Sequence, residues 1–410
     1  MFPGFVKSGA QERRLLETLL KRYNKLERPV LNETDLVEVN IGLNLQQILD
    51  IDETKQILTT NSWLNLAWTD ENLRWNSSEF GGMTSLRIDS SLIWIPDLKL
   101  YNSADEKLGL TYQTMAVVYS DGKISYIPPA IFRSSCKSDI TWFPFDKQQC
   151  DLKFGSWTYN GFLLDIQLND DKPVDVSSYI SNQEWKLLET SAKRNENYYA
   201  CCYEPYQDLT FTISLQRRSL YYFCRILLPC LLFSSLAVLV FLLPTDSAEK
   251  LFLSEITLLS LTIFQTAVSE NIPKTSTQTS LLGTYFNCLL IMTFTSVVAS
   301  VILINFNHKS QKMPKWIEMV FLKWISKLIC LPKPEISLKA GTLIEHTEYQ
   351  QEMRNDILEG VTDEMTDDKE TKLMMNDWKF AAVVLDRLCL IISLLFTAVS
   401  ITIVVLSAAP

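Results

Sequence analysis

Four long, mostly apolar runs in the second half of the chain constrain its fold more than any other feature. Three of them carry no charged residue: Ile226–Thr245, Thr275–Asn307 and Leu388–Pro410. A helix needs about 20 residues to cross the roughly 30 Å hydrocarbon core of a bilayer. Because three runs reach this length close together, they predict membrane-spanning helices and not the buried helices of a soluble protein.

The fourth run, Leu251–Ile272, is more polar than the others. It contains Glu255 and Glu270 and many serine and threonine hydroxyls. Charged side chains at membrane depth usually face the interior of a helix bundle or a water-filled path. We therefore expect this helix to face a bundle interior or a water-filled path, and not lipid on all sides.

Lysines set the expected orientation in the membrane. Lys309, Lys312 and Lys315 follow the third run, so the positive-inside rule places the next loop in the cytoplasm. Four spans then put both ends of the chain outside the cell. Met1–Arg14 has no apolar segment of the kind found in signal peptides, so we expect the native signal to have been removed or replaced.

The first half has the pattern of a sheet protein. An amphipathic helix is predicted for Glu12–Leu26, ending before Pro29, and short alternating runs separated by turn residues follow from Val37 to about Leu215. We predict an extracellular, immunoglobulin-like antiparallel β-sandwich with an N-terminal helix, then a four-helix transmembrane bundle and a partly helical cytoplasmic segment. The expected domains are residues 1–218 (sandwich), 219–306 (helices one to three), 307–377 (cytoplasmic loop with amphipathic helices) and 378–410 (fourth helix).

Composition excludes several functions. The net charge of −9 argues against a nucleic-acid partner. The only two histidines are His308 and His346, both on the cytoplasmic side, and the sequence has no phosphate loop, zinc-binding spacing or nucleophile motif. We therefore expect no enzyme activity, no cofactor and no metal site.

Four cysteines lie in the predicted extracellular half. Cys136 and Cys150 enclose thirteen residues, and a disulfide is expected between them in an oxidising compartment. Cys201 and Cys202 are adjacent, and a disulfide between them would stiffen a loop tip. Sequons at Asn32 and Asn76 permit glycosylation.

The segment between Cys136 and Cys150 contains Trp142-Phe143-Pro144-Phe145-Asp146 and resembles the signature of the Cys-loop receptors. Several further segments resemble nicotinic acetylcholine receptor α subunits in particular. They are Trp94–Asp97, Leu100–Asp105, Gly155–Tyr159 and Tyr199–Tyr206, the last with its paired cysteines. The segment Trp63–Trp75 resembles the first binding-site strand of the Cys-loop family as a whole. The resemblance covers nearly the whole chain and implies a subunit of a pentameric, amine-gated and cation-selective channel in the plasma membrane, with a synaptic location.

The resemblance also implies a ligand site between subunits. Aromatic rings bind organic cations by cation–π attraction, so acetylcholine or a related amine is the expected ligand. The implied principal face consists of Tyr101, Trp157, Tyr199, Cys201, Cys202 and Tyr206. The implied complementary face consists of Trp63, Val117 and Ile127. Both faces in one chain are compatible with a homopentamer, and a heteropentamer is the alternative.

By the same resemblance, the second span lines the pore. Its expected pore and selectivity residues are Glu249, Phe252, Ile256, Leu259, Ile263 and Glu270, with membrane lipid around the bundle. Phe252 and Ile256 replace the small polar residues usual in the family, and Glu255 is an unusual charge. We therefore expect low conductance or reluctant opening. The alternative is a ligand-binding or assembly subunit whose pore conducts poorly or not at all.

Coupling between ligand and pore is implied for one further set of residues. They are Glu53, Phe143, Pro144, Phe145, Arg217 and Pro273. A Glu53–Arg217 ion pair is one expectation, and a solvated Glu53 is the alternative. The natural agonist, the assembly partners and the permeant ion are left open by the sequence.

Overall fold

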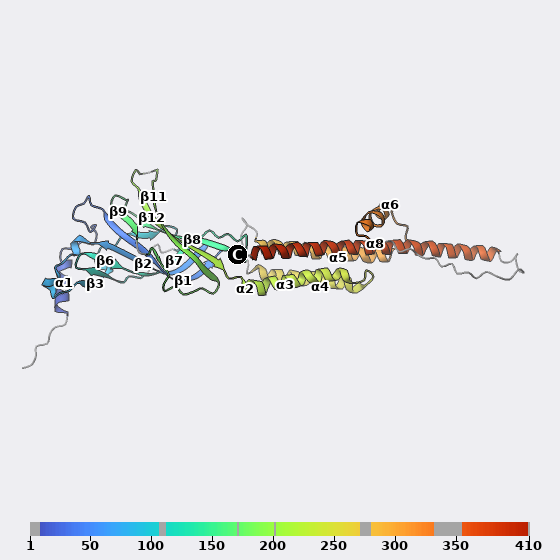
Figure 1. Ribbon diagram of the computed structural model, residues 1–410, viewed down its shortest axis with the longest axis horizontal. Helices are drawn as coiled ribbons and strands as arrows, with labels where there is room; N and C mark the ends of the chain where they lie inside the picture. The colour runs from blue at the N-terminus through green and yellow to red at the C-terminus, as the bar shows by residue number, and fades with distance from the viewer. Residues whose placement is uncertain are drawn as a thin grey trace, which may run out of the picture. The chain divides into compact units, whose positions relative to one another are not determined.

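The structure is a computed structural model that describes residues 9–105, 112–169, 172–200, 202–270, 280–331 and 355–408. The described residues as far as Ser219 form one compact unit, and those from Leu220 onward form a second. Figure 1 shows that the first unit is built mainly of strands and the second mainly of helices.

The N-terminal helix α1 covers Ala10–Leu20, which is shorter at its C-terminal end than the predicted Glu12–Leu26. A tertiary contact explains the difference. The Tyr23 hydroxyl donates to Asp70 Oδ2 at 2.6 Å and accepts the backbone N–H of Trp94 at 2.9 Å. The chain therefore leaves the helical path where Tyr23 packs into the sandwich.

Two sheets make up the sandwich (Figure 1). The large sheet contains β1 (Val37–Asp52), β2 (Ile57–Thr69), β3 (Ser85–Asp89), β5 (Met115–Tyr119), β6 (Lys123–Tyr126), β7 (Pro129–Ser135), β9 (Leu164–Leu168) and β10 (Val174–Asp175). The small sheet has the order β11 (Trp185–Asn197), β12 (Tyr206–Arg217), β8 (Lys147–Ser156) and β4 (Leu98–Leu100). Its pairs are all antiparallel, whereas β9 and β10 pair with β1 in parallel. Short 3-10 helices lie at Glu71–Leu73, Ser77–Phe80 and Ser90–Leu92.

Alternation of side chains produces the core between the sheets. In β1, Val39, Ile41 and Leu43 are fully buried, whereas the alternating polar residues Glu38, Asn40 and Asn44 are more exposed. A disulfide joins Cys136, directly after β7, to Cys150 in β8. It links the two sheets and confirms the prediction made from the spacing of these cysteines.

Among the described residues, four helices are long and apolar enough to span a membrane. The first, Leu220–Leu242, consists of α2 (Leu220–Tyr222), the π-helical η4 (Phe223–Leu227), α3 (Leu228–Leu239) and η5 (Val240–Leu242). The others are α4 (Ala248–Ser269), α5 (Leu281–Asn307) and the span Thr371–Ile403 within α8 (Asn355–Ala408). Within this unit α5 packs against α4 and α8, and α3 contacts all three.

The fourth span begins well before the apolar run at Leu388 that indicated it. Charged residues such as Asp377, Lys379 and Asp386 interrupt the hydropathy pattern but lie within the continuous helix α8. Short helical segments at Lys315–Ile317 (α6), Glu318–Ile325 (η6) and Ser326–Leu328 (α7) follow α5, and η6 packs against α8.

Candidate functional site

The four aromatic residues expected on the principal face lie at strand ends of the small sheet. Tyr101 follows β4, Trp157 follows β8, and Tyr199 and Tyr206 flank the turn between β11 and β12. The ring centroids of Tyr101 and Trp157 are 6.2 Å apart, and those of Tyr199 and Tyr206 are 5.6 Å apart, both in edge-to-face geometry. The structure therefore brings together residues that are separated by up to 105 positions in the sequence.

Burial raises the pKa of Tyr101 to about 12, and the nearby Tyr199 and Asp208 act in the same direction. Its hydroxyl donates to the carbonyl oxygen of Ser156 at 2.5 Å. Gly155 makes room for this ring, because a Cβ there would lie 2.4 Å from the tyrosine hydroxyl oxygen. Tyr101 is consequently a neutral, fixed wall of the aromatic cluster at physiological pH.

Asp97 fixes the loop that carries Trp157, a role that the sequence reasoning did not assign. Its carboxylate accepts the Ser156 hydroxyl at 2.5 Å, the Thr158 hydroxyl at 2.5 Å and the Thr158 backbone N–H at 2.8 Å. Its carbonyl oxygen also accepts the Trp157 N–H at 3.3 Å. The Trp94–Asp97 motif could have indicated this role, because its aspartate directly follows Ile95 and the conformationally restricted Pro96.

A second polar group that the sequence reasoning missed lies beside the cluster. The Asp208 side chain is fully buried and pairs with Lys153 Nζ at 3.1 Å. It also accepts hydrogen bonds from the amides of Asn195 and Asn197. The Tyr101 N–H donates to the Lys153 carbonyl at 2.7 Å, so this pair connects β8 and β12 directly to the aromatic cluster.

Much of the aromatic surface is open in the single chain. Trp157 is 61% exposed and Tyr199 is 49% exposed. Cys202, on the turn between Tyr199 and Tyr206, is disulfide-bonded, whereas Cys201 lies outside the described residues. These rings are therefore accessible to a ligand or to a neighbouring subunit.

The three residues expected on the complementary face lie on the large sheet. Trp63 belongs to β2, Val117 to β5, and Ile127 follows β6. Trp63 alternates with the buried Leu64, and Val117 with the buried Val118, so these side chains share the face of the sheet opposite the core. The principal and complementary sets thus belong to different sheets of one chain.

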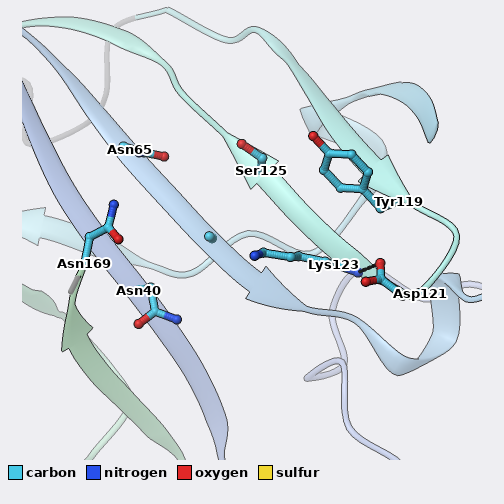
Figure 2. Close-up of a pocket in the computed structure, with 8 residues that line it drawn as sticks. Asn40, Asn65, Tyr119, Asp121, Lys123, Ser125 and Asn169 are labelled. Atoms are coloured by element: carbon cyan, nitrogen blue, oxygen red, sulfur yellow. Dashed lines mark hydrogen bonds between the residues drawn. The ribbon is translucent and has the colours of Figure 1, made fainter. Parts of the chain in front are cut away.

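The same outer face of the large sheet carries a polar hollow of about 670 Å³, which sequence reasoning did not anticipate. Its lining residues are Asn40, Asn65, Ala67, Tyr119, Asp121, Lys123, Ser125 and Asn169. Figure 2 shows the side chains of Asn65, Ser125 and Tyr119 on neighbouring strands of this face. Asn65 lies two residues from Trp63 and Ser125 pairs with Val117, so the hollow continues the complementary face.

Arg217, at the end of β12, lies at the centre of a buried cluster. Its guanidinium pairs with Asp146 and Glu184 at 2.8 Å each and with Glu53, which confirms the expected ion pair. It also stacks 5.0 Å from the ring centroid of Phe143 and 4.2 Å from that of Trp185. Burial lowers the pKa of Arg217, but Asp146 and Glu53 outweigh that effect and hold the pKa above its ordinary value.

Three further residues were expected to take part in coupling, and the structure describes two of them. Pro144 is buried and Phe145 half-buried in the same Cys136–Cys150 segment as Phe143. Pro273 lies outside the described residues. The cluster that the structure shows is therefore formed by the turn after β1, the Cys136–Cys150 segment, the start of β11 with the preceding Glu184, and the end of β12.

All the expected pore residues lie on one exposed face of α4 or at its end. They are Glu249, Phe252, Ile256, Leu259, Ile263 and Glu270. Lys250, Ser254, Thr257 and Leu261 lie on the buried face. Glu255 is exposed beside Ile256. The helix thus presents one continuous stripe that is acidic at both ends and bulky and apolar between them.

Comparison with known proteins agrees with both parts of this geometry. Residues 12–219 match the neurotransmitter-gated ion-channel ligand binding domain, and residues 226–355 match the transmembrane region of the same family. The chain belongs to the neurotransmitter-gated ion-channel family. This family consists of channels and not of enzymes, which agrees with the absence of enzyme motifs, and its members cross the plasma membrane several times.

Individual relatives in this channel family are acetylcholine receptor subunits. The chain is 44% identical over 336 residues to the acetylcholine receptor subunit alpha-type acr-16 of Caenorhabditis elegans, covering 81% of this chain and 67% of the relative. It is 42% identical over 335 residues to the neuronal acetylcholine receptor subunit alpha-2 of Gallus gallus, covering 81% and 63%. It is 44% identical over 348 residues to the acetylcholine receptor subunit alpha-L1 of Schistocerca gregaria, covering 82% and 62%.

Proposed function

We propose that this chain is an α-type subunit of a pentameric channel that acetylcholine or a related organic cation opens. The cluster of Tyr101, Trp157, Tyr199 and Tyr206 carries the proposal. Each desolvated ring contributes about 2 kcal/mol or more to binding of a cationic ligand, and tryptophan contributes most. The names of the relatives, which are acetylcholine receptor subunits, support acetylcholine as the ligand.

In this proposal the site is completed by a neighbouring subunit. Trp63, Val117 and Ile127 of that neighbour would supply the other wall, and the turn that carries Cys201 and Cys202, with the expected disulfide between them, would cover the ligand. The presence of both faces in one chain supports a homopentamer. Co-assembly with other subunits is the alternative.

The second part of the proposal concerns coupling. Ligand binding at Tyr206 would shift the position of β12. Arg217, at the opposite end of the same strand, would transmit this shift toward the pore helices. Glu53, Phe143, Pro144, Phe145 and Pro273 complete the proposed coupling set. Such coupling is a two-state equilibrium that the agonist biases, because it binds one state more tightly.

The third part concerns the pore. Symmetry-related copies of Glu249 and Glu270 would form two negative rings that concentrate cations, and Leu259 would form an apolar gate that closes by dewetting. Phe252 and Ile256 place bulky apolar side chains where water must pass, so we expect a low conductance. Residues 307–377 would form the cytoplasmic part, and the exposed Asn32 and Asn76 would carry glycans on the extracellular part.

The test is expression of this chain alone in oocytes, with acetylcholine-evoked current and surface binding of a radiolabelled nicotinic ligand measured on the same cells. Current that reverses near the cation equilibrium potential supports the whole proposal. Replacing Trp157 by alanine should abolish both signals, whereas the same replacement of the exposed Phe162 serves as control.

A second candidate function is a ligand-binding or assembly subunit with a non-conducting pore. The exposed Phe252 favours it, because a ring of phenylalanines narrows and dries a pore. Binding without current, together with current restored by Phe252→Ser, would identify this function. Absence of both binding and current in cells that display the chain at the surface would contradict the proposal.

A further inference from the structure

Two oppositely charged residues begin the proposed pore helix α4, and the structure separates them. Glu249 is exposed, whereas the adjacent Lys250 is fully buried in the helix bundle. Consecutive residues of a helix differ by about 100° in direction, so the two charges point to different surroundings. At this end of α4 only the negative charge reaches the exposed stripe.

Among the residues that the structure describes, the buried lysine has one charged partner. Lys250 Nζ donates to Asp386 Oδ1 on α8, and the two side chains are 0% and 4% exposed. The ammonium also lies 3.4 Å from the Leu243 carbonyl oxygen and 5.5 Å from the ring centroid of Phe241. Asp386 thus supplies the full charge that compensates the lysine, and the other two contacts supply partial charges.

A buried charge that loses its partner is strongly destabilised. A lysine can escape this penalty because its long stem lets the ammonium reach water while the methylenes stay buried. A released Lys250 ammonium would reach water on the exposed side of α4, where the adjacent Glu249 lies. An unpaired Lys250 would therefore bring a positive charge beside each glutamate of the proposed ring.

We infer that Asp386 determines selectivity at the pore mouth although it lies on a different helix: it holds Lys250 inside the bundle and leaves the Glu249 charge uncancelled. This inference rests on the proposed role of α4 as the pore helix. Asp386 is a positioning residue, because it acts on the permeant ion only through Lys250. The attraction of cations to Glu249 at the pore mouth then depends on contact between α8 and α4.

The first experiment measures the accessibility of Lys250 and needs no current. The purified full-length channel in lipid nanodiscs is treated briefly with a water-soluble amine acylating reagent, and labelling is quantified by mass spectrometry. The exposed Lys312 is the internal reference. Lys250 should stay unlabelled in the unmodified chain and gain about tenfold or more labelling in Asp386→Asn, because only the paired lysine is protected.

The matched control is Arg387→Gln, which neutralises the adjacent, exposed residue of α8 and should leave labelling of Lys250 unchanged. The inference is overturned if Lys250 is labelled as readily as Lys312 in the unmodified chain, or if it stays protected in Asp386→Asn. Both outcomes are readable even when the channel conducts no ions, so failure of the proposed function is distinguished from failure of this inference.

The second experiment measures the electrical consequence. Asp386→Asn should lower single-channel cation conductance and shift the reversal potential in a sodium chloride gradient toward that of chloride. The double variant Lys250→Gln/Asp386→Asn removes the displaced cation and should recover both values. If Asp386 only stabilises the fold, Asp386→Asn will lower surface binding of the radioligand but leave conductance and reversal potential unchanged, which would refute a role in selectivity.

Discussion

Two buried cations, one in each unit of the chain, are neutralised in different ways. Arg217 in the sandwich pairs with three carboxylates and stacks on two aromatic rings. Lys250 in the helical unit has one carboxylate partner, Asp386, with a carbonyl and one ring beside it. The planar guanidinium offers five donors in a fixed fork, whereas an ammonium is a compact point charge.

This difference predicts how each buried cation responds when it loses a carboxylate partner. Loss of one carboxylate leaves Arg217 with two others, so the effect should depend on how buried the lost partner is. Loss of Asp386 leaves Lys250 with no full countercharge, so the whole arrangement should change at once. A graded response is therefore expected in the sandwich and an all-or-none response between α4 and α8.

The largest effect is expected for Arg217→Gln. This change leaves Asp146 and Glu53 buried without a cation, which should destabilise the fold by about 3–5 kcal/mol. The melting temperature of the detergent-solubilised channel, followed by size-exclusion chromatography, should fall sharply. Arg217→Lys keeps the charge and should fall less. A melting temperature for Arg217→Gln within experimental error of the unmodified chain would show that the cluster does not stabilise the sandwich.

The next effect is expected for Asp386→Asn, which removes the partner of the buried ammonium. Breaking a buried ion pair costs about 3–5 kcal/mol, and release of the Lys250 ammonium to water should keep the cost at the lower end of this range. Replacing both partners, as in Lys250→Met/Asp386→Leu, should recover most of the melting temperature, since an apolar pair of similar volume can replace a buried ion pair. Strictly additive effects of Lys250→Met and Asp386→Leu in this double-mutant cycle would argue against an interaction between the two side chains.

Glu184→Gln should have a smaller effect on stability. It tests whether the loss of stability on removing a carboxylate partner of Arg217 depends on how buried that partner is. The Glu184 side chain is 46% exposed, whereas that of Asp146 is 1% exposed. A half-exposed ion pair contributes about 1 kcal/mol or less, so Glu184→Gln should shift the melting temperature far less than Asp146→Asn. Equal shifts for the two variants would contradict a response that follows burial.

The smallest effect is expected at a surface pair used as reference, Asp52 and Lys55, in which the lysine side chain is 71% exposed. The backbone N–H of Lys55, and then its ammonium, lower the pKa of Asp52. A lowered folded-state pKa stabilises the fold above the unfolded pKa, and this contribution is lost as the pH falls through the folded pKa. Asp52→Asn should therefore change the melting temperature little at pH 7 and not at all in strong acid. A large shift of the melting temperature at pH 7 would mean that solvent exposure does not determine how much each of these ion pairs stabilises the fold.

Local patterns were enough to predict much of the architecture. The uncharged runs indicated the spanning helices, alternation and turn residues indicated the sandwich, and the spacing of Cys136 and Cys150 indicated their disulfide. These features depend on the properties of neighbouring residues, namely hydrophobic length, side-chain alternation and loop closure. The ends of elements were less predictable: α1 ends at Leu20 because Tyr23 contacts Asp70, and α8 continues through charged residues that hydropathy alone would exclude.

By itself, the sequence determined which residue types are available for the proposed site: the aromatic residues, the paired cysteines and the acidic ends of α4. Only the tertiary structure decided which of them meet. Asp97 holds the loop of Trp157, Asp208 pairs with Lys153, and Asp386 reaches Lys250 across 136 positions of sequence. The physical reason is that a buried charge must find a partner wherever the fold brings one, and no local pattern records that distant choice.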